Sequence, residues 1–288
     1  MSSWTNSARI WGDAKSCLAE SRKLIVYDTE TTGLSPERDR IIEFAAIKFD
    51  VSEDYSLTQT DSLHLYINPG MPLPSIITEI TGITEEELAD KPHEEDVFDQ
   101  IRSFMDESAT ICGYNIISFD NRFIDNLYAR QGLRFKPSQV IDGIVLARDR
   151  LKKDCEVENH KLGTIAAYYG IDFQAHSALE DAGATARVVE QLFKEYAADE
   201  KDMATVKAGL IRPGIKAVRF WEGYRGFSRI YVNTDAGDLF YDIRRNESGA
   251  KPPCDIESID MEWLEAEACR VTSSAPNALR YFKGNIEL

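Results

Sequence analysis

The sequence of 288 residues has few features of a secreted, membrane-bound or nucleic-acid-coating protein. Its five cysteines are odd in number and none belongs to a Cys-x-x-Cys pair, which favours reduced thiols over a disulfide framework or a zinc site. No run of about 18 apolar residues is present, so neither a membrane span nor a signal peptide is predicted. The formal net charge is −16, whereas a protein that coats nucleic acid needs a basic surface. These absences favour a cytoplasmic globular protein.

The spacing of the apolar residues predicts an α/β fold with a mixed sheet flanked by helices. Three strands joined by short turns come first and form an antiparallel meander, and strand–helix alternation follows. We expect residues 1–21 to be an N-terminal extension, 22–200 the main domain and 205–288 a small C-terminal α+β domain. The expected strands are 24–28, 41–49, 63–67, 109–115 and 139–143, and the main expected helices are 94–105, 118–131, 144–151, 161–169 and 177–196.

Two carboxylates stand at the end of the first predicted strand, directly after the apolar run 24–27. Residues i and i+2 of a strand point to the same face, so Asp28 and Glu30 converge on one place. Two buried carboxylates that close together repel each other and lose hydration unless a cation lies between them. A solvated pair of acids at a frayed strand end is the alternative for this short pattern taken alone.

Three further residues give the pair a chemical meaning. Asp120 lies in the first turn of one predicted helix and Asp181 in the first turns of another, and His176 precedes Asp181 in a loop. Each acid alone fits a helix-start residue that interacts with the helix dipole, and a lone loop histidine fits a surface residue. Taken together, the acids can form an all-oxygen cage for two hard divalent cations, and the histidine can act as a general base.

The order of these residues resembles a known enzyme family. The segments "DTETTG" (28–33), "GYNIISFD" (113–120) and "HSALEDA" (176–182) resemble the three motifs of the DEDDh 3′-to-5′ exonuclease superfamily, which has a ribonuclease H-like fold and includes the proofreading subunits of DNA polymerase III. The resemblance covers residues 22–197. The spacing within the second motif is more similar to that of the exonuclease I branch.

The resemblance implies a role for each matching position, with two Mg²⁺ or Mn²⁺ ions in the site. Asp28 would bridge both ions, Glu30 and Asp181 would complete the first ion's ligands, and Asp120 would hold the second. His176 would be the general base. Asp142, which ends another predicted strand, is not expected to be a ligand. The residues expected to contact the substrate are Thr31, Thr32, Gly33, Leu34, Asn115 and Phe119.

The segment 206–234 lies outside the resemblance and is locally basic and aromatic. Arginines among aromatic residues can stack on bases and pair with phosphates, so Arg219, Trp221, Arg225 and Arg229 are candidates for holding a nucleic-acid strand. An ordinary half-buried hairpin with solvated arginines explains the same pattern equally well. An acidic amphipathic helix expected at 258–271 is a candidate surface for a polymerase or another protein partner.

Two functions follow from the sequence. The leading hypothesis is a divalent-metal-dependent exonuclease that removes nucleoside 5′-monophosphates from the 3′ end of single-stranded nucleic acid. DNA, in proofreading or repair, is favoured over RNA. The alternative is a binding subunit that keeps the fold to recruit other proteins, although the presence of all five catalytic identities favours the enzyme.

Overall fold

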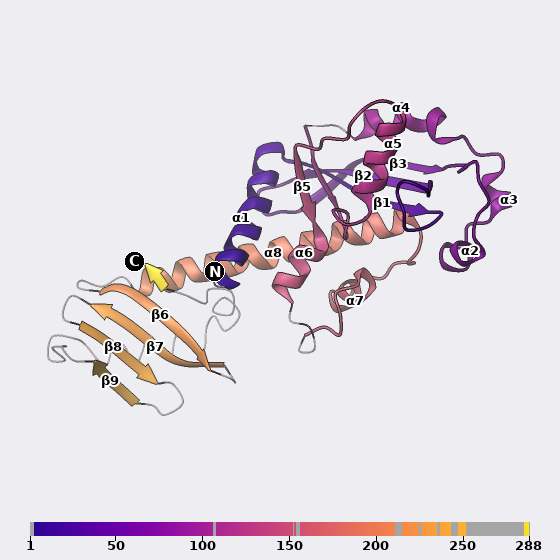
Figure 1. Cartoon of the computed structure of the whole chain (residues 1–288). Helices are drawn as coiled ribbons and strands as arrows, with labels where there is room; N and C mark the ends of the chain where they lie inside the picture. Colours follow the sequence, from indigo (N-terminus) through magenta and orange to yellow (C-terminus); the bar gives the residue numbers. More distant parts are fainter. Residues whose placement is uncertain are drawn as a thin grey trace. The chain divides into compact units, whose positions relative to one another are not determined.

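A five-stranded mixed sheet in the order β3-β2-β1-β4-β5 forms the base of the compact unit Arg9–Lys194 (Figure 1). Strands β1 (Lys23–Thr31), β2 (Ile41–Val51) and β3 (Leu57–Tyr66) pair antiparallel. Strand β4 (Thr110–Gly113) then pairs parallel with β1, and β5 (Gln139–Asp142) pairs parallel with β4. The predicted mixed α/β sheet, with its antiparallel meander first, is confirmed.

This computed structural model describes residues 3–105, 108–151, 153, 156–210, 215–223, 226–234, 237–242, 247–251 and 285–287, with side chains from 10 to 198 of these ranges. Among these residues, no helix combines the length and the apolar run that crossing a membrane would require.

The two faces of the sheet are covered by different helices. On one face, α4 (Glu94–Phe104) and α5 (Asp120–Arg130) bury Val97, Phe98, Ile101, Phe123, Ile124 and Leu127 in one cluster with Ile25, Tyr27 and Phe44 of the strands. On the other face, α8 (Ala178–Leu210) packs on β2, so that a Cβ added at Gly183 would lie 3.9 Å from Ile47 Cδ1. Because side chains alternate along β1, Asp28 and Glu30 belong to the α8 face and Thr29 to the α5 face.

Four short helices complete the connections within this unit. They are α2 (Ser75–Thr81), α3 (Glu85–Leu88), α6 (Gly143–Arg150) and α7 (Leu162–Tyr168). Helix α3 begins with a capping box in which the Thr84 hydroxyl accepts from the Glu87 amide and the Glu87 carboxylate accepts from the Thr84 amide. This arrangement satisfies two backbone amides at the start of the helix.

Several boundaries differ from those expected, and three of the differences are large. Residues 3–21, which were expected to be part of an N-terminal extension, form helix α1 (Ser3–Ser21). Its Trp11 is fully buried, and the centres of the Trp11 and Phe193 rings lie 5.6 Å apart. Trp11 Nε1 donates to Asp149 Oδ2 at 2.8 Å. Strand β3 begins at Leu57 rather than at residue 63. Its pairing with β2 extends the strand over residues 57–62, which are mostly exposed and polar. Helix α8 continues past 196 to Leu210, since residues 197–208 contain neither proline nor glycine.

The second compact unit, Met1–Ala8 with Glu195–Leu288, contains an antiparallel sheet in the order β10-β6-β7-β8-β9. The strands are β6 (Ile215–Gly223), β7 (Gly226–Thr234), β8 (Gly237–Asp242), β9 (Glu247–Lys251) and β10 (Asn285–Glu287). The helix expected at 258–271 lies outside the described residues.

Candidate active site

Three of the predicted metal ligands meet where the end of β1 faces the start of α8. Asp28, Glu30 and Asp181 each offer one carboxylate oxygen, and these oxygens lie within 4.8 Å of one another. Asp28 and Glu30 share a face because they are two residues apart on a strand, and α8 begins over that face. Two elements separated by about 150 residues of sequence therefore create this acidic cluster.

The electrostatics of the acidic cluster favour binding of a cation. Burial raises the pKa of Glu30 to about 8, with a further contribution from the carboxylate of Asp181. Burial and then the neighbouring carboxylates Asp120, Asp181, Glu30 and Glu43 raise the pKa of Asp28 well above its usual range. Burial also raises the pKa of Asp181 to about 6. An all-oxygen donor set with this excess of negative charge fits a hard divalent ion such as Mg²⁺ or Mn²⁺.

Asp120 reaches the same strand end from the opposite helical layer. It is the first residue of α5, is 3% exposed, and accepts hydrogen bonds from Thr29, from the amide at 3.0 Å and from the hydroxyl at 2.6 Å, both at Oδ1. Burial raises its pKa to about 6, although the bonds from Thr29 oppose that effect. Asp120 lies outside the group of three within 4.8 Å. Among the neighbouring carboxylates, however, it raises the pKa of Asp28 the most.

His176 lies in the turn that leads into α8 and has a left-handed backbone with φ of 73°. Its amide donates to Asp181 Oδ2 at 3.1 Å, and its ring is exposed and close enough to lower the pKa of Asp181. A left-handed conformation is uncommon outside glycine and is found mostly where surrounding contacts enforce it. The turn thus places the imidazole beside the acidic cluster.

Sequence reasoning missed a fifth carboxylate beside the acidic cluster. Glu43 of β2 pairs in register with Glu30 and is 1% exposed. Its Oε1 is 2.7 Å from His64 Nε2 and accepts from the Ser177 hydroxyl at 3.4 Å. The sequence signal for Glu43 was its position as a single acid inside the apolar run 41–47. Such a run predicts a strand buried on both faces, where a charged residue is unusual. Through Ser177, Glu43 contacts the turn that carries His176.

The predicted substrate segment Thr31–Leu34 begins the loop that joins β1 to β2. Thr31 and Thr32 are buried, and the Thr31 hydroxyl donates to the Gly33 carbonyl at 2.7 Å. Leu34, in contrast, is 82% exposed. A Cβ on Gly33 would lie 2.5 Å from Asp39 Oδ2, so this position needs glycine because of a neighbouring carboxylate within the loop.

The second predicted substrate segment is held by Asp142. Its Oδ1 accepts from the amides of Asn115 at 2.7 Å and Ile144 at 3.2 Å, and its Oδ2 accepts from the amide of Ile117 at 3.2 Å. Asn115 has a φ of 67°, and Phe119 precedes α5 with its ring 5.0 Å from that of Phe123. Asp142 therefore caps α6 and fixes the turn before Asp120.

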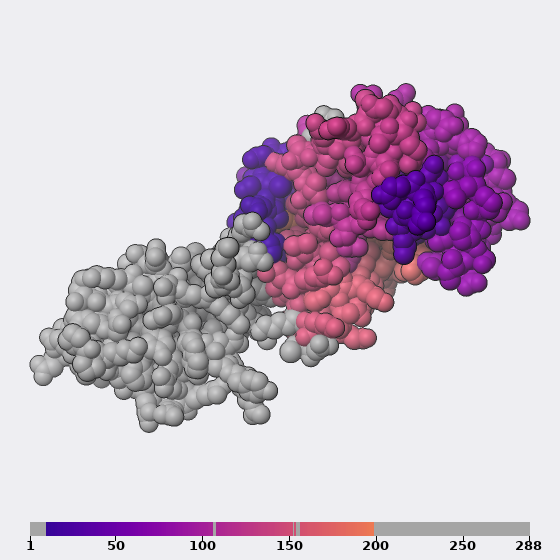
Figure 2. Space-filling model, in the orientation of Figure 1, coloured from indigo at the N-terminus to yellow at the C-terminus, as the bar shows by residue number. Residues whose placement is uncertain are grey.

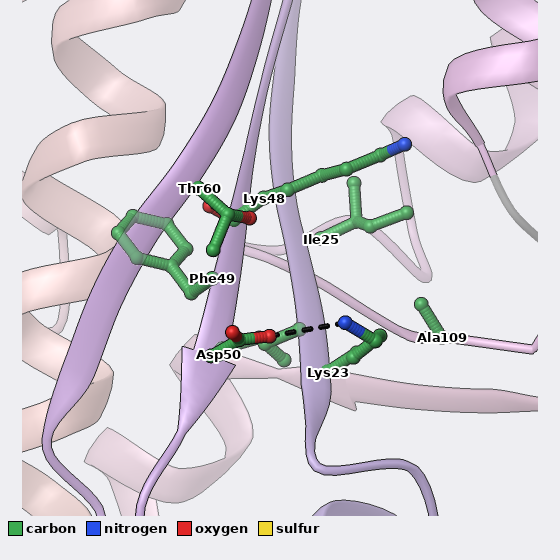
Figure 3. Close-up of a pocket in the computed structure, with 8 residues that line it drawn as sticks. Lys23, Ile25, Lys48, Phe49, Asp50, Thr60 and Ala109 are labelled. Carbon is green, nitrogen blue, oxygen red and sulfur yellow. Dashed lines mark hydrogen bonds and ion pairs between the residues drawn. The ribbon is translucent and has the colours of Figure 1, made fainter.

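A small pocket of about 140 Å³ lies at the opposite end of β1 (Figure 3). It is lined by residues that include Lys23, Lys48 and Thr60, and the Lys23 ammonium pairs with Asp50 at 3.1 Å across its mouth. The Lys48 ammonium lies 4.3 Å from the centre of the Phe104 ring. None of the predicted site residues lines this pocket, so the acidic cluster is the candidate site.

The candidate residues of the tail are placed only by their backbones. In the register of β6 and β7, Arg219 is opposite Tyr231 and Trp221 is opposite Arg229. Arg225 lies outside the described residues, as do the side chains of the other three. Their role in holding a strand stays a prediction.

Comparison with curated proteins identifies relatives of the first unit. The chain is 36% identical over 178 residues to the PolC-type DNA polymerase III of Lacticaseibacillus paracasei, which covers 62% of this chain and 12% of the relative. It is 33% identical over 182 residues to the same protein of Bacillus subtilis, again with 62% of this chain and 12% of the relative covered. The chain thus spans about an eighth of the length of these relatives.

Solved structures share the fold. Exonuclease I superposes with a TM-score of 0.52 at 21% identity, covering 76% of this chain and 55% of that one. E. coli exonuclease I in complex with a dT13 oligonucleotide gives a TM-score of 0.52 at 20% identity and the same coverage. The sequence model of the Exonuclease family (RNase_T) matches residues 25–189, which include Asp28, Glu30, Asp120, His176 and Asp181. The chain belongs to this exonuclease family.

Proposed function

We propose that this protein is a divalent-metal-dependent 3′-to-5′ exonuclease that releases nucleoside 5′-monophosphates from single-stranded DNA. The observation that carries the proposal is the acidic cluster, in which oxygens of Asp28, Glu30 and Asp181 lie within 4.8 Å of one another and the Asp181 carboxylate raises the pKa of both Asp28 and Glu30. A chain that gains nothing from a cation has no physical reason to gather these charges at the end of a buried strand.

The proposed roles follow from position. Divalent cations, when bound, supply the positive charge that activates water and stabilises the leaving oxygen of a phosphodiester. Asp28, whose pKa is raised by the carboxylates of both Glu30 and Asp120, would contribute to both cation sites. Asp120 is oriented by its two bonds from Thr29, and the exposed His176 ring would take the proton from the attacking water.

The proposed 3′-to-5′ direction of degradation and the proposed DNA substrate are inferred from the relatives and from the loops around the site. The relatives are PolC-type DNA polymerases, and the E. coli exonuclease I of similar fold was solved with a dT13 oligonucleotide. For this chain we propose that a single-stranded 3′ end lies across the segments Thr31–Leu34 and Asn115–Phe119. A polymerase is the class of protein partner that the relatives favour.

The test uses a single-stranded oligonucleotide labelled at its 5′ end. With magnesium, the labelled product should shorten in single-nucleotide steps, and excess chelator should stop the shortening. A second strand with a blocked 3′ end serves as the control and should persist. Immediate release of a labelled mononucleotide would instead indicate degradation from the 5′ end, and persistence of the unblocked strand would contradict the proposal.

A further inference from the structure

The loop between β1 and β2 is folded by its own polar groups. Asp39 Oδ2 accepts from the Ser35 amide at 2.7 Å, and its Oδ1 accepts from the Thr32 hydroxyl at 3.5 Å. The Thr32 amide donates to the Arg40 carbonyl at 2.9 Å, and the Arg40 amide donates to the Thr32 hydroxyl at 3.0 Å. In Figure 2 the dark indigo atoms of this loop lie on the surface of the unit Arg9–Lys194. An exposed loop of this length needs such bonds to keep one conformation.

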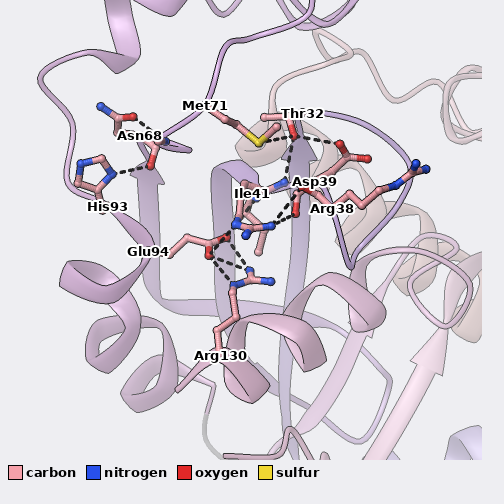
Figure 4. Close-up of polar contacts among 11 residues, drawn as sticks. Thr32, Arg38, Asp39, Ile41, Asn68, Met71, His93, Glu94 and Arg130 are labelled. Carbon is pink, nitrogen blue, oxygen red and sulfur yellow. Dashed lines mark hydrogen bonds and ion pairs between the residues drawn. The ribbon is translucent and has the colours of Figure 1, made fainter. Parts of the chain in front are cut away.

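A partly buried ion pair lies beneath the loop (Figure 4). Glu94 of α4 is 7% exposed and receives a two-point contact from Arg130 of α5, with Nε 2.9 Å from Oε2 and Nη2 2.8 Å from Oε1. A forked arginine–carboxylate pair fixes the orientation of both groups. Because Glu94 is buried and held at two points, its carboxylate is a fixed anchor for whatever packs on it.

The loop is attached to this ion pair at its C-terminal end. The Ile41 amide donates to Glu94 Oε1 at 3.4 Å, and Arg40 Nε lies 3.8 Å from Glu94 Oε2. The Arg40 guanidinium also turns back and donates through Nη1 to the carbonyls of Arg38 at 3.2 Å and Asp39 at 3.0 Å. One arginine therefore connects the backbone of the loop to a carboxylate that α5 holds in place.

We propose that Glu94, Arg130 and Arg40 form a clamp that positions the Thr31–Leu34 segment against the 3′-terminal nucleotide. These are positioning residues, since they act through the loop and do not touch the reacting atoms. The clamp couples that segment to α5, the helix whose first residue is Asp120. The inference rests on the proposed function for the identity of the ligand and on the contacts above for the clamp itself.

The kinetic test compares Glu94→Gln with the wild type on two single strands, one ordinary and one whose 3′-terminal nucleotide lacks its base. On the ordinary strand kcat/KM should fall roughly 10-fold to 100-fold, the usual effect of misplacing a bound group by about 1 Å. On the strand without the terminal base the loss should be much smaller, because the contact between the Thr31–Leu34 segment and that base is already absent. Equal losses on both strands, or no loss on either, would overturn the proposal.

Two further variants and one direct measurement complete the design. Glu95→Gln makes the same change at the exposed neighbouring position and should leave both rates unchanged. Arg130→Lys keeps the charge without the fork and should give a smaller loss of the same pattern, which covers the case in which Glu94→Gln does not fold.

Hydrogen exchange in chelator then examines the loop without any activity. In Glu94→Gln the amides of Thr32, Ser35 and Arg40 should exchange faster, while those of β3 and of β2 beyond Ile41 keep the wild-type rates. Unchanged exchange in the loop would overturn the clamp. If the wild type degraded no strand, the proposed function would fail, but this comparison would still support or overturn the clamp.

Discussion

Replacing Glu30 by glutamine should stabilise the metal-free protein at pH 8, although Glu30 is a proposed ligand. Burial and the Asp181 carboxylate raise the pKa of Glu30 from 4.5 to about 8. The folded state therefore binds this proton more tightly than the unfolded chain does, and stability falls as pH rises between these two values. The loss is absent below about pH 4.5 and complete above about pH 8.

The pKa difference sets the magnitude. Each unit of difference in pKa corresponds to about 1.4 kcal/mol, so ionising Glu30 in the fold costs about 5 kcal/mol at high pH. Glutamine has nearly the same shape and no charge, so Glu30→Gln should recover much of this free energy at pH 8 and under about 1 kcal/mol at pH 5. Magnesium should reverse the order, because it stabilises the folded wild type by binding and the variant has lost a ligand.

The assay is urea denaturation in excess chelator at pH 5 and pH 8, repeated with magnesium. Glu53→Gln, at an exposed position in the turn after β2, is the matched control and should follow the wild type throughout. The reasoning would be refuted by a metal-free wild type whose stability does not fall between pH 5 and pH 8. A variant less stable than the wild type at pH 8 in chelator would refute it equally.

Three other substitutions test individual residues of the site. His176→Ala should lower kcat roughly 10²-fold to 10⁴-fold, as for loss of a general base, while calorimetry shows metal affinity retained; a loss as severe as that of Asp181→Asn would contradict its role. Gly33→Ala should raise KM roughly 10-fold, because the new Cβ would lie 2.5 Å from Asp39 Oδ2 and must displace that carboxylate. Adding Asp39→Ser to this variant should cause little further loss. Fully additive losses would show that the two positions act separately. Asp142→Ala should lower the free energy of unfolding by about 3 kcal/mol or more, since three backbone amides lose a charged acceptor; a change below about 0.5 kcal/mol in urea denaturation would contradict this account.

The sequence predicted much of the fold and the residues of the acidic cluster, because both depend on local periodicity. Strand alternation puts Asp28 and Glu30 on one face, and the helix starts place Asp120 and Asp181 without knowledge of long-range contacts. The family motifs then supplied the joint meaning of these positions.

Features that depend on register and distant pairing were not predicted. Glu43 lies beside Glu30 only because of the register of β1 and β2, which the turn between them determines. The Glu94–Arg130 pair joins two residues that are 36 positions apart in sequence and lie on different helices. Asp142 was not expected to be a ligand, and its three amide partners depend on a left-handed turn at Asn115 that no sequence pattern revealed.

The most direct test of the central claim is the nuclease activity of Asp28→Asn in magnesium. This substitution removes the charge of the carboxylate whose pKa burial and four neighbouring acids raise well above its usual range, and it changes the side chain's shape very little. The account predicts that an end-labelled single strand stays intact with the variant at an enzyme concentration that degrades it fully with the wild type, while circular dichroism shows the same fold. Degradation by Asp28→Asn at the wild-type rate would contradict the assignment of this acidic cluster as the metal-dependent active site.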